Sequence, residues 1–500
     1  MFFVLLFATS SLDCLLLNEN PYNLEELIVM LEVIFTKDEP LKDVVKVITM
    51  FEDKPATVEF LSTKEAKLVE TAIIQANFEA KAGDYLNVYG GTSKIVLLGL
   101  GKNDDDLNIQ GVGEKLFNIL FNDEAAYIFA ENDQIAQNLA YGVLLGSYSF
   151  DKYKTEKKDD EYTKLEQISL KVDDVEKNTE EFKSYVAMAN GIRYCKDLCN
   201  EPASYLTPEV FAYDIKRLEY LGLDVELLNL DAIHLKGLGL VEAVAKDSSN
   251  LPYVVIMSWR GNPEKNDYDL GLVGKGVCFD SGGVSLKSGG GMIEMKMDMT
   301  GAACVVASMK VAALQRIKKN IVAVVSLVEN MPDGNAVKIG DIVTAYNGRT
   351  VEVLNADAEG RLIVADALAY MQKNFKVSKI VDLATLGTIS AMFGNVYAGL
   401  FSNDEKLTKT LIAAGEKSGE KLWHLPMNED YEKMIKSDVA DIKNIPTGQS
   451  ARITSVAFLN KFIEKGTKWA HIDISSLRLD KTGLSSGFGV KLLNEVMKGL

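Results

Sequence analysis

The stretch "DLGLVGKGVCFD", residues 269–280, consists mainly of Leu, Val, Phe, Cys and Gly. A run this apolar is typical of a strand that is buried on both faces of a sheet. The runs "NIVAVVSLVEN" (320–330) and "KIVDLATL" (379–386) have the same character. Residues 300–317 and 359–374 lie between them and show the spacing of apolar residues that indicates helices. Strands that alternate with helices predict an α/β domain built on a mixed, largely buried sheet.

A second and smaller α/β domain is predicted before this one. Strand-like runs such as "SKIVLLGLGK" (93–102) alternate there with helical patterns. The fold class is therefore α/β with two domains. The predicted organisation is an N-terminal extension (1–29), an N-terminal α/β domain (30–172), a connecting helix (173–199) and a larger C-terminal α/β domain (200–500).

The first residues, "MFFVLLFATSS", resemble the apolar part of a signal peptide but lack a basic segment before it. The favoured interpretation is that translation begins at Met30, and export is the alternative. No window of the chain holds 18 consecutive apolar residues, so no membrane span is predicted. Five cysteines in 500 residues fit a reducing compartment, and a cytoplasmic location is expected.

Charge and histidine content narrow the possible functions. The net charge of −17 argues against binding of nucleic acid through a general basic surface. The chain has only three histidines, none of them in an HExxH motif, which excludes the common histidine-based zinc sites. A bound metal would need mainly oxygen ligands, which favours Mg, Mn or a carboxylate-held Zn.

Charged residues nevertheless occur where the surrounding sequence predicts burial. They are Lys275 and Asp280 near the end of the first strand, Lys287 after a turn, Asp298 before a helix, and the charges of "NADAEGRL" (355–362). In that last stretch Asp357, Glu359 and Arg361 alternate, so we expect them on one face of an extended chain.

Each of these residues has an ordinary explanation when it is taken alone. Asp298 would most often be a helix cap. Lys275 would most often extend its ammonium to water. An Asp/Glu pair at alternate positions is normally a solvated strand face. The segment "GLVGKG" (271–276) is not a phosphate-binding loop of the P-loop type, because Gly276 and not Ser or Thr follows the lysine.

Together these residues indicate a metal site. Four carboxylates lie at ends of α/β elements, where such sheets gather their sites. Crowded carboxylates repel one another, and two divalent cations would balance their four charges. Lys275 could join such a site only as the neutral amine, and we expect burial and metal binding to lower its pKa.

The segments "VGKGVCFDSGG" (273–283), "MKMDMTGAA" (295–303) and "NADAEGRL" together resemble the signature segments of the M17 leucine aminopeptidases, the cytosol aminopeptidase family. The resemblance is nearly free of gaps from Arg193 to about Ser476 and includes "WAHIDISS" (469–476). The first half of the chain is similar to the family only in its general pattern.

The resemblance implies a metalloaminopeptidase, a hydrolase that removes the N-terminal residue, preferably Leu or another apolar residue, from peptides. It implies two divalent ions per subunit, foremost Mn or Zn, with Mg or Co as alternatives. Carried over by position, the tighter ion would be held by Lys275, Asp280, Asp298 and Glu359, and the more exchangeable ion by Asp280, Asp357 and Glu359. Lys287 and Arg361 would be the catalytic pair, with bicarbonate near Arg361. A cytoplasmic homohexamer is also implied.

The chain departs from the family pattern at two places. Ala356 stands where the family usually has Thr, and this side chain is expected to alternate away from Asp357. In "DLATLGTIS" (382–390), Thr385 and Leu386 remain but Gly387 and Thr388 are exchanged relative to the family. These four residues and Met295 are the implied side-chain pocket, so the exchange bears on the preference for leucine. The alternatives are a DNA-binding regulator with incidental peptidase activity and a structural pseudoenzyme.

Overall fold

The computed structural model describes residues 31–40, 44–52, 54, 58, 60–90, 93–102, 105–156, 158, 161–387, 389–446 and 451–499. The expected extension (1–29) and Thr388 lie outside these residues. The chain divides into two compact units, Met1–Ala189 and Asn190–Leu500. The helix expected at 173–199 is observed as α4 (Val175–Asn200), and the division between the units falls within it.

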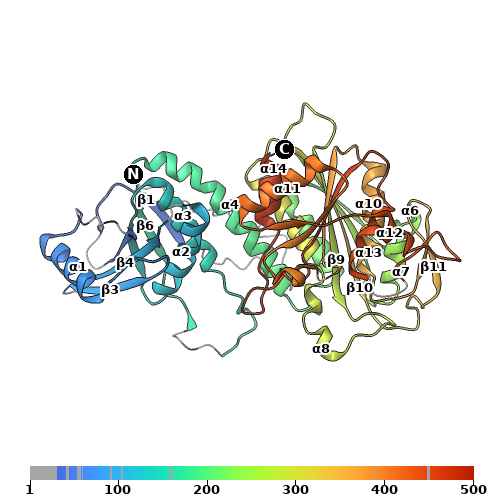
Figure 1. The fold of residues 1–500 in the computed structure, drawn as a ribbon, viewed down its shortest axis with the longest axis horizontal. Coiled ribbons are helices and arrows are strands. Elements are labelled where there is room, and N and C mark those ends of the chain that lie inside the picture. The colour runs from blue at the N-terminus through green and yellow to red at the C-terminus, as the bar shows by residue number, and fades with distance from the viewer. Residues whose placement is uncertain are drawn as a thin grey trace, which may run out of the picture. The chain divides into compact units, whose positions relative to one another are not determined.

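The N-terminal unit contains a six-stranded sheet with the order β1-β6-β5-β2-β4-β3 (Figure 1). All neighbours pair in parallel except β3 and β4, which are antiparallel. The strands are β1 (Glu32–Thr36), β2 (Val45–Phe51), β3 (Tyr85–Gly90), β4 (Ser93–Gly101), β5 (Ala125–Phe129) and β6 (Gln167–Lys171). The helices between them are α1 (Thr63–Ala76), α2 (Asp106–Ile119) and α3 (Asp133–Gly146). Each of these helices begins after a side-chain cap, supplied by Ser62, Asp105 and Asn132.

The C-terminal unit is built on an eight-stranded sheet with the order β15-β14-β17-β13-β9-β10-β8-β7. Its strands are β7 (Asp224–Leu228), β8 (Tyr253–Arg260), β9 (Leu270–Asp280), β10 (Asn320–Asn330), β13 (Lys379–Ala384), β14 (Ala398–Ser402), β15 (Leu422–His424) and β17 (Lys468–Asp473). The central strand β9 is parallel to β10 and β13, whereas β8 is antiparallel to β10. Every residue of β10 is buried. The predicted mixed and largely buried sheet is confirmed.

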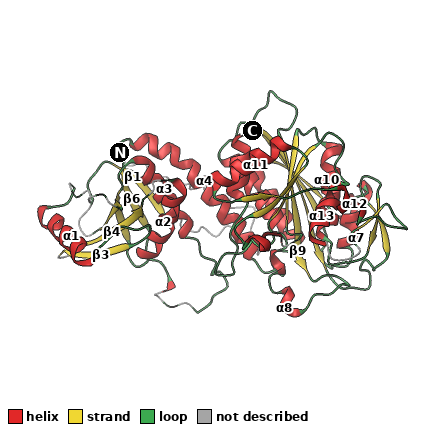
Figure 2. Cartoon of the chain, in the orientation of Figure 1, coloured by secondary structure: helices red, strands yellow, loops and turns green. Residues whose placement is uncertain are grey.

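Helices cover both faces of this sheet (Figure 2). The α-helices that follow α4 are α5 (Pro208–Arg217), α6 (Leu230–Lys236), α7 (Gly239–Ala245), α8 (Gly289–Met292), α9 (Thr300–Leu314), α10 (Gly360–Asn374), α11 (Glu405–Ser418), α12 (Glu429–Lys433), α13 (Ala451–Asn460) and α14 (Val490–Gly499). A smaller sheet joins β11 (Asp341–Thr344), β12 (Thr350–Val353) and β16 (Ile442–Lys443).

Two of these helices, α9 and α10, lie directly against opposite faces of β9. A Cβ atom on Gly274 would lie 2.6 Å from Ala302 Cα of α9, and one on Gly271 would lie 2.4 Å from Met371 Sδ of α10. The glycines therefore allow both helices to approach the strand closely. Among the described residues, the helical stretch Gly289–Leu314 meets the length and composition criteria for a membrane span, but 89% of its apolar window is buried inside the unit.

Candidate metal centre and active site

The stretch "NADAEGRL" does not form an extended chain, and the expectation of three charges on one strand face is wrong. Strand β12 ends at Val353, and α10 begins at Gly360. The Asn355 side chain accepts a hydrogen bond from the backbone N–H of Asp357 (2.8 Å), which closes a local turn. Glu359 already has helical backbone angles (φ −76°, ψ −37°). Its carboxylate is therefore placed by a turn that leads into a helix.

Three carboxylates meet at this turn. Asp280 comes from the end of β9, and Asp357 and Glu359 come from the turn before α10. One ligand oxygen of each lies within 4.8 Å of the other two. Asn330, at the end of β10, donates from Nδ2 to Asp280 Oδ1 (2.8 Å) and to the Ala356 carbonyl oxygen (3.0 Å). This amide therefore fixes the strand and the turn relative to each other.

Lys275 of β9 contacts two further oxygens of the cluster and is 3% exposed. Its Nζ lies 2.6 Å from Asp298 Oδ2 and 2.9 Å from Glu359 Oε1, and it donates to the Thr385 carbonyl oxygen (2.9 Å). Burial by itself lowers the pKa of Lys275, but the carboxylates of Asp298, Glu359 and Asp280 outweigh burial and raise it. These carboxylates therefore favour the ammonium form of Lys275, whereas burial and a bound cation would favour the neutral amine expected of a ligand.

The Asp298 side chain does not cap the N-terminus of α9. The position before α9 is Met299, which makes no side-chain cap. Asp298 instead accepts a hydrogen bond at Oδ1 from the Thr385 hydroxyl (2.7 Å) and is 6% exposed. Its carboxylate thus faces the same cluster as Lys275.

Burial raises the pKa values of the enclosed carboxylates, because it disfavours their charged forms. For Asp280 the pKa rises to about 6, with burial as the main cause and the charge of Glu359 as the next. Burial likewise raises the pKa of Asp298 and of Glu359. Burial therefore destabilises the charged forms of these carboxylates, and a nearby positive charge offsets this effect.

Of the implied catalytic pair, Lys287 contacts the cluster, and Arg361 lies near enough to Glu359 for their charges to interact. Lys287 donates hydrogen bonds from Nζ to Asp280 and Asp357. Burial lowers its pKa, but the charge of Asp280 and the bonds to both carboxylates outweigh burial and raise it. Arg361 is 5% exposed and donates from one terminal nitrogen to the Asn444 carbonyl oxygen (2.8 Å). Burial lowers the pKa of Arg361 to about 10.

This donor set fits divalent cations. The four carboxylates carry four negative charges, and the two lysines that contact them, Lys275 and Lys287, supply two positive ones. Asp298 Oδ2 and Glu359 Oε1 are buried, and both lie beside Lys275 Nζ. Buried carboxylate oxygens of this kind are suitable ligands for a hard or borderline metal ion.

The residues of the implied side-chain pocket are only partly brought to this centre. Thr385 contacts Asp298 and Lys275. The Gly387 N–H donates to Asp473 Oδ2 (2.7 Å), Leu386 packs against the hydrophobic core, and Met295 is half-buried. Thr388 lies outside the described residues.

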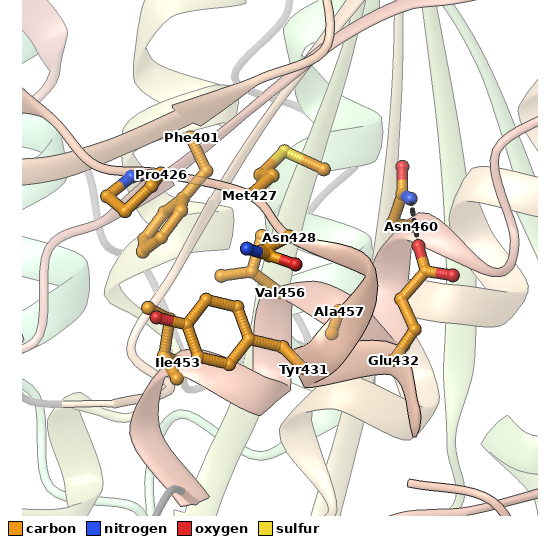
Figure 3. Close-up of a pocket in the computed structure, with 10 residues that line it drawn as sticks. All are labelled: Phe401, Pro426, Met427, Asn428, Tyr431, Glu432, Ile453, Val456, Ala457 and Asn460. Carbon is orange, nitrogen blue, oxygen red and sulfur yellow. Dashed lines mark hydrogen bonds between the residues drawn. The ribbon is translucent and has the colours of Figure 1, made fainter. Parts of the chain in front are cut away.

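A small cavity elsewhere in the unit is not part of this site. It measures about 10 Å³ and is lined by Phe401, Pro426, Met427, Asn428, Tyr431, Glu432, Ile453, Val456, Ala457 and Asn460 (Figure 3). None of these residues is a predicted ligand, catalytic residue or pocket residue. Its volume is about that of one water-sized probe.

Sequence analysis missed the amides that support the centre. Asn330 could have been noticed, because it is a polar residue at the carboxyl end of a mainly apolar strand. Asn444 gives no such signal. Its Oδ1 accepts the N–H groups of Leu354 (2.9 Å) and Asn355 (3.3 Å), and its Nδ2 donates to the Asn355 carbonyl oxygen (2.7 Å). About 90 residues separate these partners in sequence, so only the fold shows the contact.

The chain matches known proteins over most of its length. The catalytic domain of the cytosol aminopeptidase family matches residues 193–494, and the N-terminal domain of the same family matches residues 47–157. A probable cytosol aminopeptidase of Rhizobium etli (strain CIAT 652) is 38% identical over 491 residues, which cover 93% of this chain and 98% of the relative.

Solved structures show the same fold. A mutant of tomato leucine aminopeptidase superposes with a TM-score of 0.83 at 28% identity, covering 94% of this chain and 97% of that chain. The bottromycin maturation enzyme BotP in complex with Mn superposes with a TM-score of 0.80 at 27% identity, covering 91% and 99%. The chain therefore belongs to the cytosol aminopeptidase family and is a metal-dependent aminopeptidase.

Proposed function

We propose that this aminopeptidase releases N-terminal residues, preferably Leu or another apolar residue, at a centre for two divalent ions. Lys275, Asp280, Asp298 and Glu359 would hold the tighter ion. Asp280, Asp357 and Glu359 would hold the more exchangeable one, so that Asp280 and Glu359 serve both. The observation that carries this proposal is the approach of Asp280, Asp357 and Glu359 within 4.8 Å, with Asp298 joined to Glu359 through Lys275.

Two bound ions supply Lewis acidity for the reacting carbonyl and lower the pKa of an attacking water. Mn or Zn is proposed first, with Mg or Co as alternatives, because the donor set is mainly carboxylate. Support for Mn comes from the BotP structure, which contains it. Lys275 releases its proton when it becomes a ligand, so metal loading is expected to release protons.

Lys287 and Arg361 are proposed as the catalytic residues. The ammonium of Lys287 donates to Asp280 and Asp357, so it lies at carboxylates that would hold the more exchangeable ion. A donor in that position stabilises the oxyanion that forms in the transition state. The Nε–H of Arg361 is buried and has no acceptor among the described residues. A bicarbonate ion held there could receive and return the proton of the attacking water.

The side-chain pocket is proposed to comprise Met295, Thr385, Leu386, Gly387 and Thr388. Support comes from Thr385, which links this loop to Asp298 and Lys275. Apolar side chains at Met295 and Leu386 favour an apolar first residue of the peptide.

The remaining proposals concern assembly, location and domain limits. We propose a cytoplasmic homohexamer, with a catalytic domain at 200–500, a connecting helix at 173–199 and an N-terminal domain at 30–172. The names of the relatives as cytosol aminopeptidases support the location.

The comparisons do not support the alternative of a DNA-binding regulator, and the net charge of −17 opposes it.

Hydrolysis of leucine p-nitroanilide tests the proposal. The protein is stripped of metal and assayed after Mn, Zn, Mg or Co is restored. Activity is expected to return with metal, and to be lost in Asp357→Ala but not in Asp224→Ala, an exposed carboxylate of β7. Full activity in Asp357→Ala would contradict the assignment. A panel of other amino-acid anilides then measures the side-chain preference.

A further inference from the structure

The N-terminal unit contains a cleft of about 720 Å³ that the aminopeptidase reaction does not use. Its floor is formed by Ile48 and Thr49 of β2 and by Phe129, the last residue of β5. Lys37 follows β1, and Lys171 ends β6. The cleft therefore opens at the carboxyl ends of four parallel strands. Its volume lies in the range of about 300–1,000 Å³ that is typical of small-molecule sites.

The order of the strands in the sheet also indicates a ligand-binding site at this position. The chain leaves β2 and passes through α1 and β3 to β4, which lies on one side of β2. It then returns to β5 on the other side of β2 and continues through α3 to β6, farther away on that side. The direction of the connections thus reverses between β2 and β5. Open α/β sheets bind their ligands at such a reversal, outside the carboxyl ends of the strands.

Charged groups line the mouth of the cleft in pairs of opposite sign. Lys54 Nζ lies 3.9 Å from Glu131 Oε2. Lys171 Nζ lies 2.6 Å from Glu39 Oε1 and 6.0 Å from the ring centroid of Phe129. Lys37 is exposed at the same end of the sheet. Lys37, Lys54 and Lys171 bring three ammonium groups to a lining that also holds the carboxylates of Glu131, Asp133 and Asp173. An anion such as phosphate would compete with these carboxylates for the lysines.

Carboxylates and aromatic rings complete the lining. Glu131 and Asp173 are exposed at the cleft and can accept hydrogen bonds from hydroxyl groups. Asp133 is occupied, because it accepts the N–H of Asp173 (2.9 Å) and the amide of Asn178 (2.5 Å). Phe60 stacks on Phe129 with ring centroids 3.5 Å apart and planes at 5°, which gives a flat apolar wall. A ligand that matches this lining has an anionic end, hydroxyl groups and a planar ring.

We propose that this cleft binds a nucleotide, with its phosphate at Lys37, Lys54 and Lys171, its ribose hydroxyls at Glu131 or Asp173, and its base against Phe60. The site is separate from the metal centre and is formed by residues of the N-terminal unit alone. Nucleotide binding at this cleft is therefore independent of the aminopeptidase mechanism.

Titration calorimetry of the full-length protein tests the proposal, with AMP, ADP, adenosine and inorganic phosphate as separate probes. AMP or ADP is expected to bind with a Kd below about 1 mM, and at least about tenfold more tightly than adenosine or phosphate. The variants Lys37→Ala and Lys54→Ala should each weaken nucleotide binding. Lys64→Ala, an exposed lysine of α1 outside the cleft, is the matched control and should not.

Three results would overturn the proposal. They are no saturable binding of either nucleotide, equal binding of phosphate and nucleotide, and an equal effect of Lys64→Ala and Lys37→Ala. Phe60→Ala should reduce the ratio of nucleotide affinity to phosphate affinity. If this variant fails to fold, Lys37→Ala and Lys54→Ala still test the proposal. Leucine anilide hydrolysis should be unchanged in the lysine variants, which shows that the protein is intact.

Discussion

The two sheets of this protein present polar groups at the carboxyl ends of their parallel strands in different ways. In the C-terminal unit, Lys275 and Glu359 are 3% and 2% exposed and contact each other. In the N-terminal unit, Lys37 and Lys54 are exposed beside a cleft. The free energy of a buried charge depends strongly on its partners, whereas water screens the interactions of an exposed charge. A single substitution should therefore act through the whole cluster in the first site and only locally in the second.

The largest effect is expected from Glu359→Gln, because Glu359 is proposed to serve both ions. The value of kcat/KM for leucine p-nitroanilide should fall by about 1,000-fold or more, equivalent to about 4 kcal/mol. Nucleotide binding at the N-terminal cleft should not change. The matched control is Glu226→Gln, an exposed carboxylate of β7. Retention of a tenth of the activity would show that Glu359 is not essential to the centre.

Removal of metal should affect the two units differently. A ligand that binds only the folded state stabilises it, by about 2.7 kcal/mol at one hundred times its Kd. Chelation should therefore lower the unfolding temperature of the catalytic unit as well as abolish activity. Differential scanning calorimetry with and without Mn measures the shift. An unchanged thermogram after complete chelation would mean that the carboxylate cluster needs no cation for stability.

Asn330→Ala should have a smaller effect, because Asn330 acts through Asp280 and the turn that carries Asp357. Loss of such a supporting hydrogen bond typically weakens metal binding about 10–100-fold. Activity should therefore require more metal, and excess metal should largely restore kcat. Asn335→Ala, in the exposed loop after β10, is the control. A loss of kcat that metal cannot restore would contradict this positioning role.

The smallest expected effect is a pH dependence of stability from His471. Its Nδ1 lies 2.6 Å from Asp382 Oδ1, and both side chains are fully buried. Burial lowers the pKa of His471, but Asp382 outweighs burial and raises it above the ordinary value of 6.5. The folded state then binds the proton more tightly than the unfolded state. This contribution to stability is full below pH about 6.5 and is lost as the pH rises through the folded pKa.

Urea unfolding between about pH 6 and pH 9 measures this contribution. The free energy of unfolding should decrease more steeply with rising pH in the parent protein than in His471→Gln. Equal slopes in the two proteins would show that the buried pair does not bind the proton more tightly on folding.

Much of the fold and of the site was predictable from sequence because the relevant signals are local. The apolar run 269–280 marks β9, and the charges within and after it mark the site. The turn at Asn355 was not predictable from alternation, because a side-chain hydrogen bond ends the extended chain there.

The close approach of Gly360 to Lys275 has a consequence for how this sequence can change. A Cβ atom at position 360 would lie 2.3 Å from Lys275 Cε and 2.5 Å from its Nζ. A larger residue at 360 therefore requires the end of the Lys275 side chain to move, while a shorter side chain at 275 would leave space that a methyl group at 360 could fill. The two positions form a coupled pair, 85 residues apart in sequence, in which a compensated double substitution could restore packing but not the Nζ donor.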